Sequence, residues 1–407
     1  MQSSLPKVKL ALLQVLLASL LLSSCSGERS AVGAPESLPW STRIADYFLS
    51  RHPEGVTYDS ASPDQKWNYE QGLMLVALQR MSEHVGNAKY FDFTRKNLDR
   101  YVEADGRIRT YKAADYNLDN IGPGRALLAV YQATGERRYR AAADSLRMQL
   151  RRQPRTKEGG FWHKEIYPNQ MWLDGLFMAA PFYAAYARRF GEPEAFDDIA
   201  HQFKTIALHT RDPKTGLLYH AWDESKQQRW ADPVTGHSPC FWGRAMGWYA
   251  MALVEVLDFF PLDHPDRSDL IVILQELSRA LMAFRDERTH LWYQVVDQQQ
   301  REGNYLETSA SCMFAYAFAK GAALGYLDPR YRTAAKETFL GIIEYQVKTS
   351  PSGAVDLYGT CRGAGLGGKP YRDGSFAYYI GEPQRVNDMK GLGPFLLTAI
   401  ALEQDKQ

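Results

Sequence analysis

The chain of 407 residues lacks an excess of either charge and contains few cysteines. Lys and Arg number 48 against 47 Asp and Glu, so there is no basic surplus to neutralise a phosphate backbone, and nucleic acid is not an expected partner. Four cysteines are too few for a disulfide-rich scaffold. The glycine-rich run 363–368 lacks the Lys-Ser/Thr that follows in a phosphate-binding loop. What remains is an ordinary globular composition, with 45% hydrophobic and 23% charged residues.

The potential metal ligands also lack the spacing of a metal centre. Cys240, Cys312 and Cys361 are separated by 72 and 49 residues, which matches no zinc finger or ribbon. The histidines show no ligand spacing, and no Ser-His-Asp arrangement stands out. We therefore expect no metal and no cofactor. The three cysteines are expected as buried thiols, although an oxidising compartment would permit one disulfide.

Residues 1–24 have the pattern of a bacterial export signal. Two lysines precede the apolar run 10–22, which is short for a membrane span, and the sequence Leu-Ser-Ser-Cys ending at Cys25 resembles a lipobox. Residues 25–37 are rich in small residues and predict a flexible tether. We expect an exported lipoprotein at the periplasmic face or cell surface, which touches the membrane only through a lipid on Cys25. An ordinary secretory signal with an incidental cysteine is the alternative.

Helical periodicity dominates after residue 37, and helices of two kinds alternate. The twelve predicted helices span about 39–51, 67–85, 88–104, 120–135, 137–153, 172–190, 193–210, 243–260, 268–284, 308–325, 329–347 and 390–404. Helix 172–190 is apolar nearly all round and must be buried on every side, whereas helix 193–210 is amphipathic. We therefore predict an all-α (α/α)6 barrel of six inner and six outer helices, as a single domain over 38–407. An open superhelix of helix pairs would need a repeated motif, and none is found.

Long loops precede the helices of the apolar kind. If the helices alternate in direction around a ring, these loops emerge together and surround its mouth, where we expect the site. The loops span 105–116, 156–169, 214–239, 289–305 and 351–386.

Two carboxylates lie where apolar helices begin. Asp119 precedes the helix predicted from 120, and Asp174 lies in the first turn of helix 172–190. An Asp at such a position commonly caps free backbone N–H groups, which is the structural alternative for both residues. Asp174, however, is surrounded in sequence by Trp172, Leu173 and Leu176. Burial there would raise its pKa, as a general acid at neutral pH requires.

Arg244 lies near the start of another apolar helix and needs an anion. A protein carboxylate such as Asp119 or Asp174 would serve, as would a ligand carboxylate. Trp248 follows Arg244 by four residues and shares its helix face, and Trp242 begins the same helix. These indoles are either core residues or platforms for a sugar ring.

Three motifs together resemble glycoside hydrolase family 105, whose members are unsaturated rhamnogalacturonyl hydrolases. They are Trp-Leu-Asp-Gly-Leu-Phe-Met-Ala around Asp174, Tyr-His-Ala-Trp-Asp around His220, and Phe-Trp-Gly-Arg-Ala-Met-Gly-Trp-Tyr around Arg244. The resemblance spans nearly all of residues 39–404 and implies the same (α/α)6 fold. It makes 38–407 a catalytic domain.

The resemblance also implies the residues of the site. Asp174 would be the catalytic acid/base and Asp119 the second carboxylate. Cys240 lies where many relatives have an acidic or other small residue, near enough to the pocket to affect specificity. The residues that would bind the sugar are His163, Lys164, His220, Trp242, Arg244 and Trp248, with an aromatic wall from Trp67 and Tyr69.

The implied reaction releases the unsaturated galacturonyl residue from lyase-generated rhamnogalacturonan oligosaccharides. Asp174 would deliver a proton to C4 of the C4=C5 double bond, water would add at C5, and the hemiketal would collapse. One alternative is an unsaturated glucuronyl hydrolase acting on glycosaminoglycan or algal-polysaccharide fragments. Another is an ordinary glycosidase that uses Asp119 and Asp174 as its acid/base pair. A third is a surface lipoprotein that binds glycans without cleaving them, which would have no need of a desolvated acid.

Overall fold

The computed structural model describes residues 38–56, 66–350 and 354–404. The predicted signal 1–24, the tether 25–37 and the lipidation of Cys25 lie outside these residues. The chain separates into Met1–Leu38 and Pro39–Gln407, and every element below belongs to the second unit. Within the described residues, no helix combines the length and the apolar character needed to cross a membrane.

Thirteen α-helices occur among the described residues, and twelve of them correspond to the predicted helices. The predicted helices are α1 Trp40–Arg51, α2 Tyr69–Val85, α3 Ala88–Asp99, α4 Gly124–Thr134, α5 Arg137–Arg152, α6 Leu173–Phe190, α7 Ala195–Thr210, α8 Gly243–Val256, α9 Arg267–Ala283, α10 Thr308–Ala323, α11 Arg330–Gln346 and α13 Met389–Glu403.

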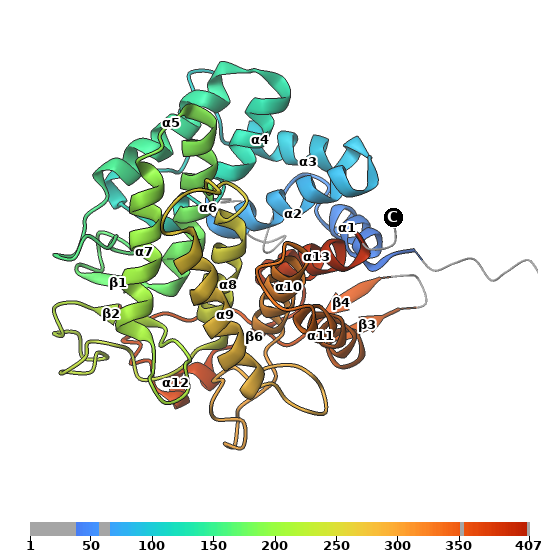
Figure 1. Ribbon diagram of the computed structural model, residues 1–407. Helices are drawn as coiled ribbons and strands as arrows, with labels where there is room; N and C mark the ends of the chain where they lie inside the picture. The colour runs from blue at the N-terminus through green and yellow to red at the C-terminus, as the bar shows by residue number, and fades with distance from the viewer. Residues whose placement is uncertain (1–37, 57–65, 351–353, 405–407) are drawn as a thin grey trace, which may run out of the picture. The chain divides into compact units, whose positions relative to one another are not determined.

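The helices form two concentric rings, as predicted for an (α/α)6 barrel. Helices α2, α4, α6, α8, α10 and α13 each contact the next, and α13 contacts α2 to close the inner ring. Helices α3, α5, α7, α9 and α11 each pack outside the inner helix that precedes them, and α1 packs against α13 and α2 (Figure 1). The burial pattern explains this sorting, because every residue of α8 is buried whereas α5 buries mainly one face.

Close contacts within the inner ring require glycine at particular points. A Cβ on Gly72 of α2 would lie 2.6 Å from the backbone nitrogen of Pro123, just before α4. A Cβ on Gly393 of α13 would lie 2.6 Å from Leu73 Cγ of α2. These distances are shorter than van der Waals contact, so glycine lets the neighbouring segments approach closely.

Short strands connect the loops that precede the inner helices. β1 Gln170–Trp172 pairs antiparallel with β2 Ala221–Asp223, with Met171 opposite Trp222. β5 Thr360–Cys361 pairs with β6 Gln384–Arg385, and β3 Val347–Thr349 pairs with β4 Val355–Leu357. Two 3-10 turns, η1 Ala113–Asp115 and η2 Leu118–Asn120, precede α4.

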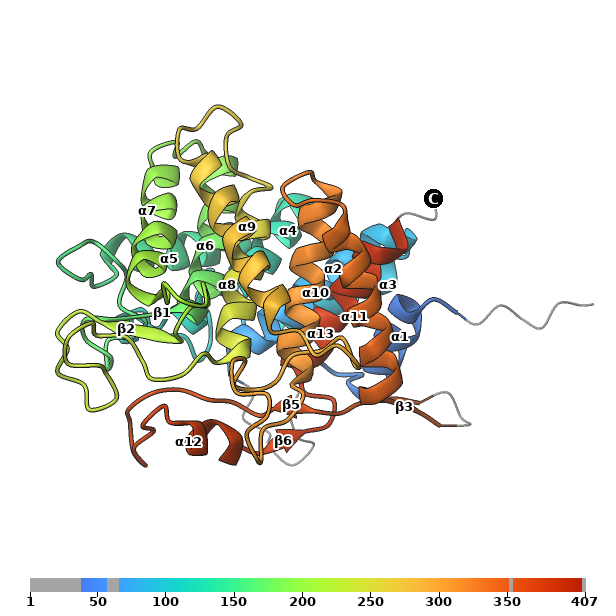
Figure 2. The same ribbon diagram turned by 60° about the horizontal axis from the view of Figure 1, so that its bottom comes forward.

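The thirteenth helix, α12 Phe376–Gly381, belongs to this loop layer. Periodicity did not predict α12, because six residues are too few to display a helical repeat. Figure 2 shows β1, β2, β5, β6 and α12 together along one end of the helices. This layer forms the mouth of the barrel.

Candidate active site

Asp119 lies in η2 and pairs with the loop that precedes α6. Its Oδ2 lies 2.6 Å from Lys164 Nζ, and its Oδ1 lies 3.5 Å from His163 Nε2. The backbone N–H of Leu118 donates to the carbonyl of His163 at 3.1 Å and joins the two loops. Burial tends to raise the pKa of Asp119, but Lys164 and His163 lower it below its usual value. Asp119 is therefore an ionised carboxylate at neutral pH.

Asp174 faces His220 at the amino end of α6. Oδ2 of Asp174 lies 3.1 Å from Nε2 of His220, although the pair does not meet hydrogen-bond geometry. Both atoms are buried and have no hydrogen-bond partner within the described part of the chain. The other nitrogen of His220, Nδ1, lies 2.7 Å from the hydroxyl of Tyr379. A buried carboxyl oxygen without a partner is costly unless a ligand completes the site.

Neither carboxylate acts as a helix cap. The N-cap of α4 is Pro123 and that of α6 is Trp172, and neither helix has a side-chain capping bond. The structural alternative from the sequence is therefore not observed for Asp119 or Asp174.

A flat aromatic stack lines the wall beside the two carboxylates. The His163 ring is nearly parallel to Trp172 at 4.6 Å between centroids, and Tyr167 also stacks on Trp172, at 4.9 Å. Burial lowers the pKa of His163 to about 4 despite the nearby Asp119, so its ring is neutral at neutral pH. Its Nδ1 is buried without a partner among the residues described.

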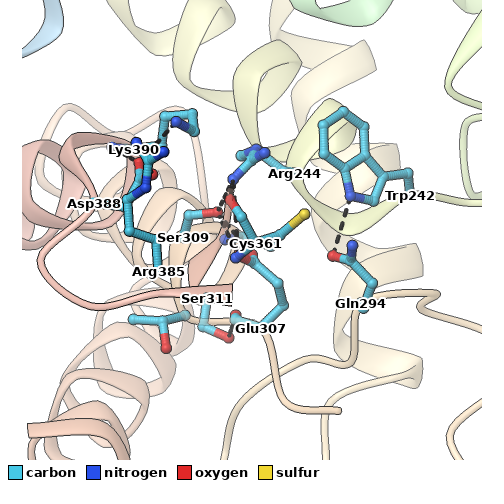
Figure 3. Close-up of polar contacts among 12 residues, drawn as sticks. Trp242, Arg244, Gln294, Glu307, Ser309, Ser311, Cys361, Arg385, Asp388 and Lys390 are labelled. Carbon is cyan, nitrogen blue, oxygen red and sulfur yellow. Dashed lines mark hydrogen bonds and ion pairs between the residues drawn. The ribbon is translucent and has the colours of Figure 1, made fainter. Parts of the chain in front are cut away.

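Arg244 lies in the first turn of α8 and uses only part of its guanidinium group. Its Nη1 donates to the carbonyl of Cys361 and lies 3.4 Å from Ser309 Oγ, with Glu307 Oε1 at 4.0 Å (Figure 3). Nε has no hydrogen-bond partner among the described residues. The considered salt bridges to Asp119 and Asp174 are not observed, because the nearest carboxylate is Glu307.

A second buried charge cluster lies beside Arg244. Lys390 Nζ pairs with Glu70 Oε1 and lies 2.8 Å from Asp388 Oδ1 (Figure 3 shows Lys390 and Asp388). Burial raises the pKa of Tyr69, whose hydroxyl is influenced by Lys390, Asp119 and Arg244. Tyr69 therefore lies between Asp119 and the cluster of Lys390 and Arg244.

The predicted tryptophans occupy three different places. Trp248 is buried below the mouth, edge-on to Tyr69 at 6.0 Å. Trp242 lies 4.7 Å from the His220 ring, and its N–H donates to Gln294 Oε1 at 3.1 Å. Trp67 is 2% exposed, and its N–H donates to the carbonyl of Asn120 at 2.8 Å. Trp67 thus supports η2 from behind and does not face the mouth.

Several charged or polar residues of the site escaped the sequence analysis: Glu70, Gln294, Glu307, Tyr379, Asp388 and Lys390. Two of them carry the signal that singled out Asp174, a charged group where an apolar helix begins. Glu307 is the N-cap of α10, and Lys390 is the second residue of α13. Tyr379 lies on α12, which the sequence pattern did not predict.

The cysteines are buried free thiols, as expected, in the described residues. Burial raises the pKa of Cys240 to about 12, so this residue is a neutral wall element and not a nucleophile at neutral pH.

Comparison with known proteins places this geometry in context. The sequence model of Glycosyl Hydrolase Family 88 matches residues 40–405. A family 105 glycoside hydrolase from C. acetobutylicum ATCC 824 is 45% identical, with a TM-score of 0.86 over 90% of this chain and 100% of that chain. The unsaturated rhamnogalacturonyl hydrolase YesR of Bacillus subtilis (strain 168) is 28% identical over 64% of this chain and 72% of its own. An unsaturated glucuronyl hydrolase from Bacillus sp. GL1 shares the fold, with 16% identity and a TM-score of 0.67 over 90% and 95% of the two chains.

Proposed function

The chain belongs to Glycosyl Hydrolase Family 88 and is a glycoside hydrolase, and we propose that it hydrates the C4=C5 double bond of a terminal unsaturated galacturonyl residue. The substrate is a lyase-generated rhamnogalacturonan oligosaccharide, from which this residue is released. One observation carries the proposal: two carboxylates at the mouth have opposite surroundings. Asp119 is held ionised by Lys164, whereas Asp174 faces, among the described residues, a histidine nitrogen that has no hydrogen-bond partner. Such a difference separates an acid from a fixed charge.

Hydration of the C4=C5 double bond requires one proton donor beside an anionic sugar. The substrate is a vinyl ether conjugated to a carboxylate, so protonation at C4 generates an oxocarbenium-like centre at C5. Asp174 donates this proton, water adds at C5, and the resulting carboxylate accepts a proton from the water. The hemiketal then opens and the aglycone leaves. Asp119 cannot be the first donor at neutral pH because Lys164 keeps it ionised.

Arg244 supplies the counter-charge for the substrate carboxylate. Its Nη1 is held by the carbonyl of Cys361, whereas Nε, on the other edge of the guanidinium fork, has no partner among the described residues. An arginine held in this way offers a planar pair of donors to a carboxylate. The aromatic stack of His163, Trp172 and Tyr167 provides the flat apolar surface that a sugar ring requires.

The alternative substrate is an unsaturated glucuronyl unit. Elimination across C4 and C5 removes the stereocentre by which galacturonyl and glucuronyl residues differ. The two substrates therefore present the same terminal sugar, and they differ in the anomeric linkage and the aglycone. The relative named for rhamnogalacturonan, at 28% identity, supports the first choice over the glucuronyl hydrolase at 16%.

The test follows the ultraviolet absorbance of the conjugated double bond over time. One reaction contains an unsaturated rhamnogalacturonan disaccharide, and a parallel reaction contains an unsaturated glucuronyl disaccharide from a glycosaminoglycan. We expect the absorbance to fall with the first substrate and to change little with the second. Loss only with the second would move the substrate but keep the hydration chemistry. Release of reducing sugar from saturated glycosides, with no loss of absorbance, would contradict the mechanism.

We also propose that the protein is exported as a lipoprotein anchored through Cys25. The support is the sequence Leu-Ser-Ser-Cys after a short apolar run. Metabolic labelling with a fatty acid should mark the wild-type protein, and Cys25→Ser should abolish the label. A labelled Cys25→Ser variant, or an unlabelled wild type, would contradict this proposal.

A further inference from the structure

Tyr379 is held in place behind His220, the histidine that faces Asp174. Its side chain is fully buried, and its ring stacks on Trp242 with 5.8 Å between centroids. The amide of Gln294 donates to the carbonyl of Tyr379 at 3.1 Å and accepts from the Trp242 N–H, a bond drawn in Figure 3. These contacts aim the Tyr379 hydroxyl at His220 Nδ1, 2.7 Å away.

The direction of this hydrogen bond follows from the partners of the hydroxyl. Burial raises the pKa of Tyr379 well above its usual range, so the hydroxyl keeps its proton. Within the described part of the chain, His220 Nδ1 is its hydrogen-bond partner and no second acceptor lies in reach. If Nδ1–H donated to the hydroxyl, the phenolic proton would be buried without an acceptor, at a cost of about 1–3 kcal/mol. The hydroxyl therefore donates, and Nδ1 is the acceptor.

In its neutral form the His220 ring must then carry its proton on Nε2, because a neutral imidazole carries one N–H. Nε2 is the nitrogen that lies 3.1 Å from Asp174 Oδ2. Trp172, in a T-shaped arrangement, and Trp242, tilted, lie against the ring at 5.3 and 4.7 Å between centroids and hold its orientation. Catalytic hydrogen bonds commonly reach full alignment only in the substrate complex, which accounts for the imperfect angle of this pair.

An Nε2–H only 3.1 Å from Oδ2 decides which oxygen of Asp174 carries the acid proton. A proton on Oδ2 would lie close to the Nε2 proton and be repelled by it, so the carboxylic acid form carries its proton on Oδ1. Oδ2 is fully buried, whereas the Asp174 side chain as a whole is 13% exposed, so its accessible surface excludes Oδ2. We propose that Tyr379 is a positioning residue that fixes the His220 proton on Nε2 and thereby places the acid proton of Asp174 on Oδ1, toward the substrate. This role rests on the proposed function of Asp174.

The same tautomer serves the second half of the reaction. Once Asp174 has given up its proton, Nε2–H donates to the carboxylate and stabilises its charge until water returns a proton. A histidine protonated on Nδ1 instead would present a lone pair to this carboxylate and would repel it. Loss of the Tyr379 hydroxyl should therefore slow turnover more than it weakens binding.

The experiment compares Tyr379→Phe with Tyr378→Phe as a matched control. Tyr378 lies on the same helix, and its hydroxyl accepts from the Gly365 N–H at 2.9 Å. Nitrogen NMR of histidine-labelled protein reports which ring nitrogen is protonated, and His220→Gln identifies the His220 signals. We expect protonated Nε2 and bare Nδ1 in the wild type and in Tyr378→Phe. In Tyr379→Phe we expect a mixture of tautomers and a kcat about tenfold to a hundredfold lower, with KM changed less than about twofold.

The tautomer measurement needs no substrate, so it separates this proposal from the proposed function. A wild type with protonated Nδ1, whether neutral or as imidazolium, would overturn the proposal even if the enzyme hydrates its substrate. An unchanged His220 spectrum in Tyr379→Phe would also overturn it. A wild type with the expected tautomer but no loss of absorbance on either unsaturated disaccharide would instead refute the function.

Discussion

Asp119 and Asp174 owe their different properties to the residues that face them. Asp119 has a lysine at 2.6 Å and a histidine at 3.5 Å, and its pKa is lowered in consequence. Asp174 has neither a cation from lysine or arginine nor a hydrogen bond to Oδ2 among the described residues. Two carboxylates of the same chemical type can therefore take different roles at one pH.

Replacement of Asp174 by Asn tests its role as the acid. The amide keeps the size and polarity of the carboxyl but cannot donate a proton to carbon. We expect kcat to fall by about a hundredfold to ten-thousandfold, the usual contribution of a general acid. Binding of the unsaturated disaccharide, measured by calorimetry, should be retained within a few-fold. Activity within a few-fold of the parent would contradict the assignment.

Replacement of Arg244 by Lys tests its role as the carboxylate clamp. Lysine keeps the positive charge but cannot hold the Cys361 carbonyl and the substrate at once. Loss of one charge-assisted hydrogen bond, about 1.5–3 kcal/mol, should raise KM by about tenfold to a hundredfold and change kcat less. Ser309→Ala is the control, because the Ser309 hydroxyl accepts only a long bond from Arg244 Nη1, at 3.4 Å, and donates to Glu307 at 2.8 Å. An unchanged KM in Arg244→Lys would make this arginine purely structural.

The sequence alone identified the site residues that stand out chemically from their neighbours. Asp174 and Arg244 are charged residues in apolar segments, and each can be recognised from its own short stretch of sequence. Their partners are not visible in this way. Tyr379 is 159 residues from His220, and Cys361 is 117 residues from Arg244. Such pairs form only when the barrel folds and brings distant segments together, so no local sequence pattern predicts them.

At the scale of elements, helices were predicted better than their ends. The helix predicted over 88–104 ends at Asp99 in the structure. The prediction ran too far because Tyr101 and Val102, which lie in a turn and a bridge, are buried and continue the apolar pattern. Apolar periodicity reports burial, and residues of a turn can be buried too. The short strands and α12 were missed for a related reason. They consist of two to six residues, which is fewer than two full repeats of either a helix or a strand and too short for a periodic pattern to be recognised.

Gly72 offers a test of how closely the inner ring is packed. Alanine usually stabilises a helix over glycine by about 0.8–1.0 kcal/mol. Here the new Cβ would meet backbone atoms of Gly122 and Pro123 at 2.6–2.7 Å, and backbone cannot move aside cheaply. Overpacking costs about 1–3 kcal/mol, so we expect Gly72→Ala to lower the free energy of unfolding by about 1–2 kcal/mol. Urea unfolding provides the measurement.

The control for Gly72 is a helical glycine with free space around it. Gly381→Ala, at the end of α12, would place a Cβ with nothing within 4 Å and should leave stability unchanged or slightly raised. Gly72→Ala should also lower activity, because Gly122 lies three residues after Asp119 and any shift is transmitted to η2. A Gly72→Ala protein as stable as the wild type would show that the two segments can separate without cost.

At the scale of the whole barrel, the alternation of helix directions explains where the site lies. The inner helices run in the same direction, and their amino ends meet at the mouth. Asp174, Arg244 and Lys390 are each the second residue of their helices, and Glu307 is an N-cap. The amino end of a helix carries partial positive charge and favours an anion by about 0.3–1 kcal/mol. A ring of helix amino ends therefore suits a substrate whose terminal sugar carries a carboxylate.

Deeper in the ring, one buried carboxylate joins four of the six inner helices. Glu255 of α8 is 1% exposed and forms ion pairs with Arg80 of α2 at 2.9 Å, Arg125 of α4 at 2.5 Å and Lys320 of α10 at 2.9 Å. Tyr316 of α10 also donates to it. Burial tends to raise the pKa of Glu255, but Arg125, Arg80 and Lys320 together lower it well below the usual 4.5.

This depressed pKa ties the stability of the barrel to pH in a defined direction. The contribution of Glu255 is fully present above its unfolded value of about 4.5, and it is lost as the pH falls through the lower folded value. Glu255→Gln removes the buried counter-charge of Arg125 and leaves Arg80 and Lys320 with the partly exposed Asp258, so we expect a loss of about 3–5 kcal/mol at neutral pH. Below pH 4.5 the variant should lose stability less steeply than the wild type, because the depressed carboxylate is gone. Urea unfolding between pH 3 and 7 measures both effects.

Asp258→Asn is the matched control for Glu255→Gln. Asp258 contacts the same Lys320 at 2.6 Å and Arg80 at 3.4 Å, but its side chain is 28% exposed, so solvent weakens these pairs. We expect a loss below about 1 kcal/mol and an acid limb like that of the wild type. If the two variants lost equal stability, burial of Glu255 would not be what matters. Equal acid slopes in Glu255→Gln and wild type would mean that other carboxylates govern acid unfolding, and the inner ring would then owe its closure to apolar packing alone.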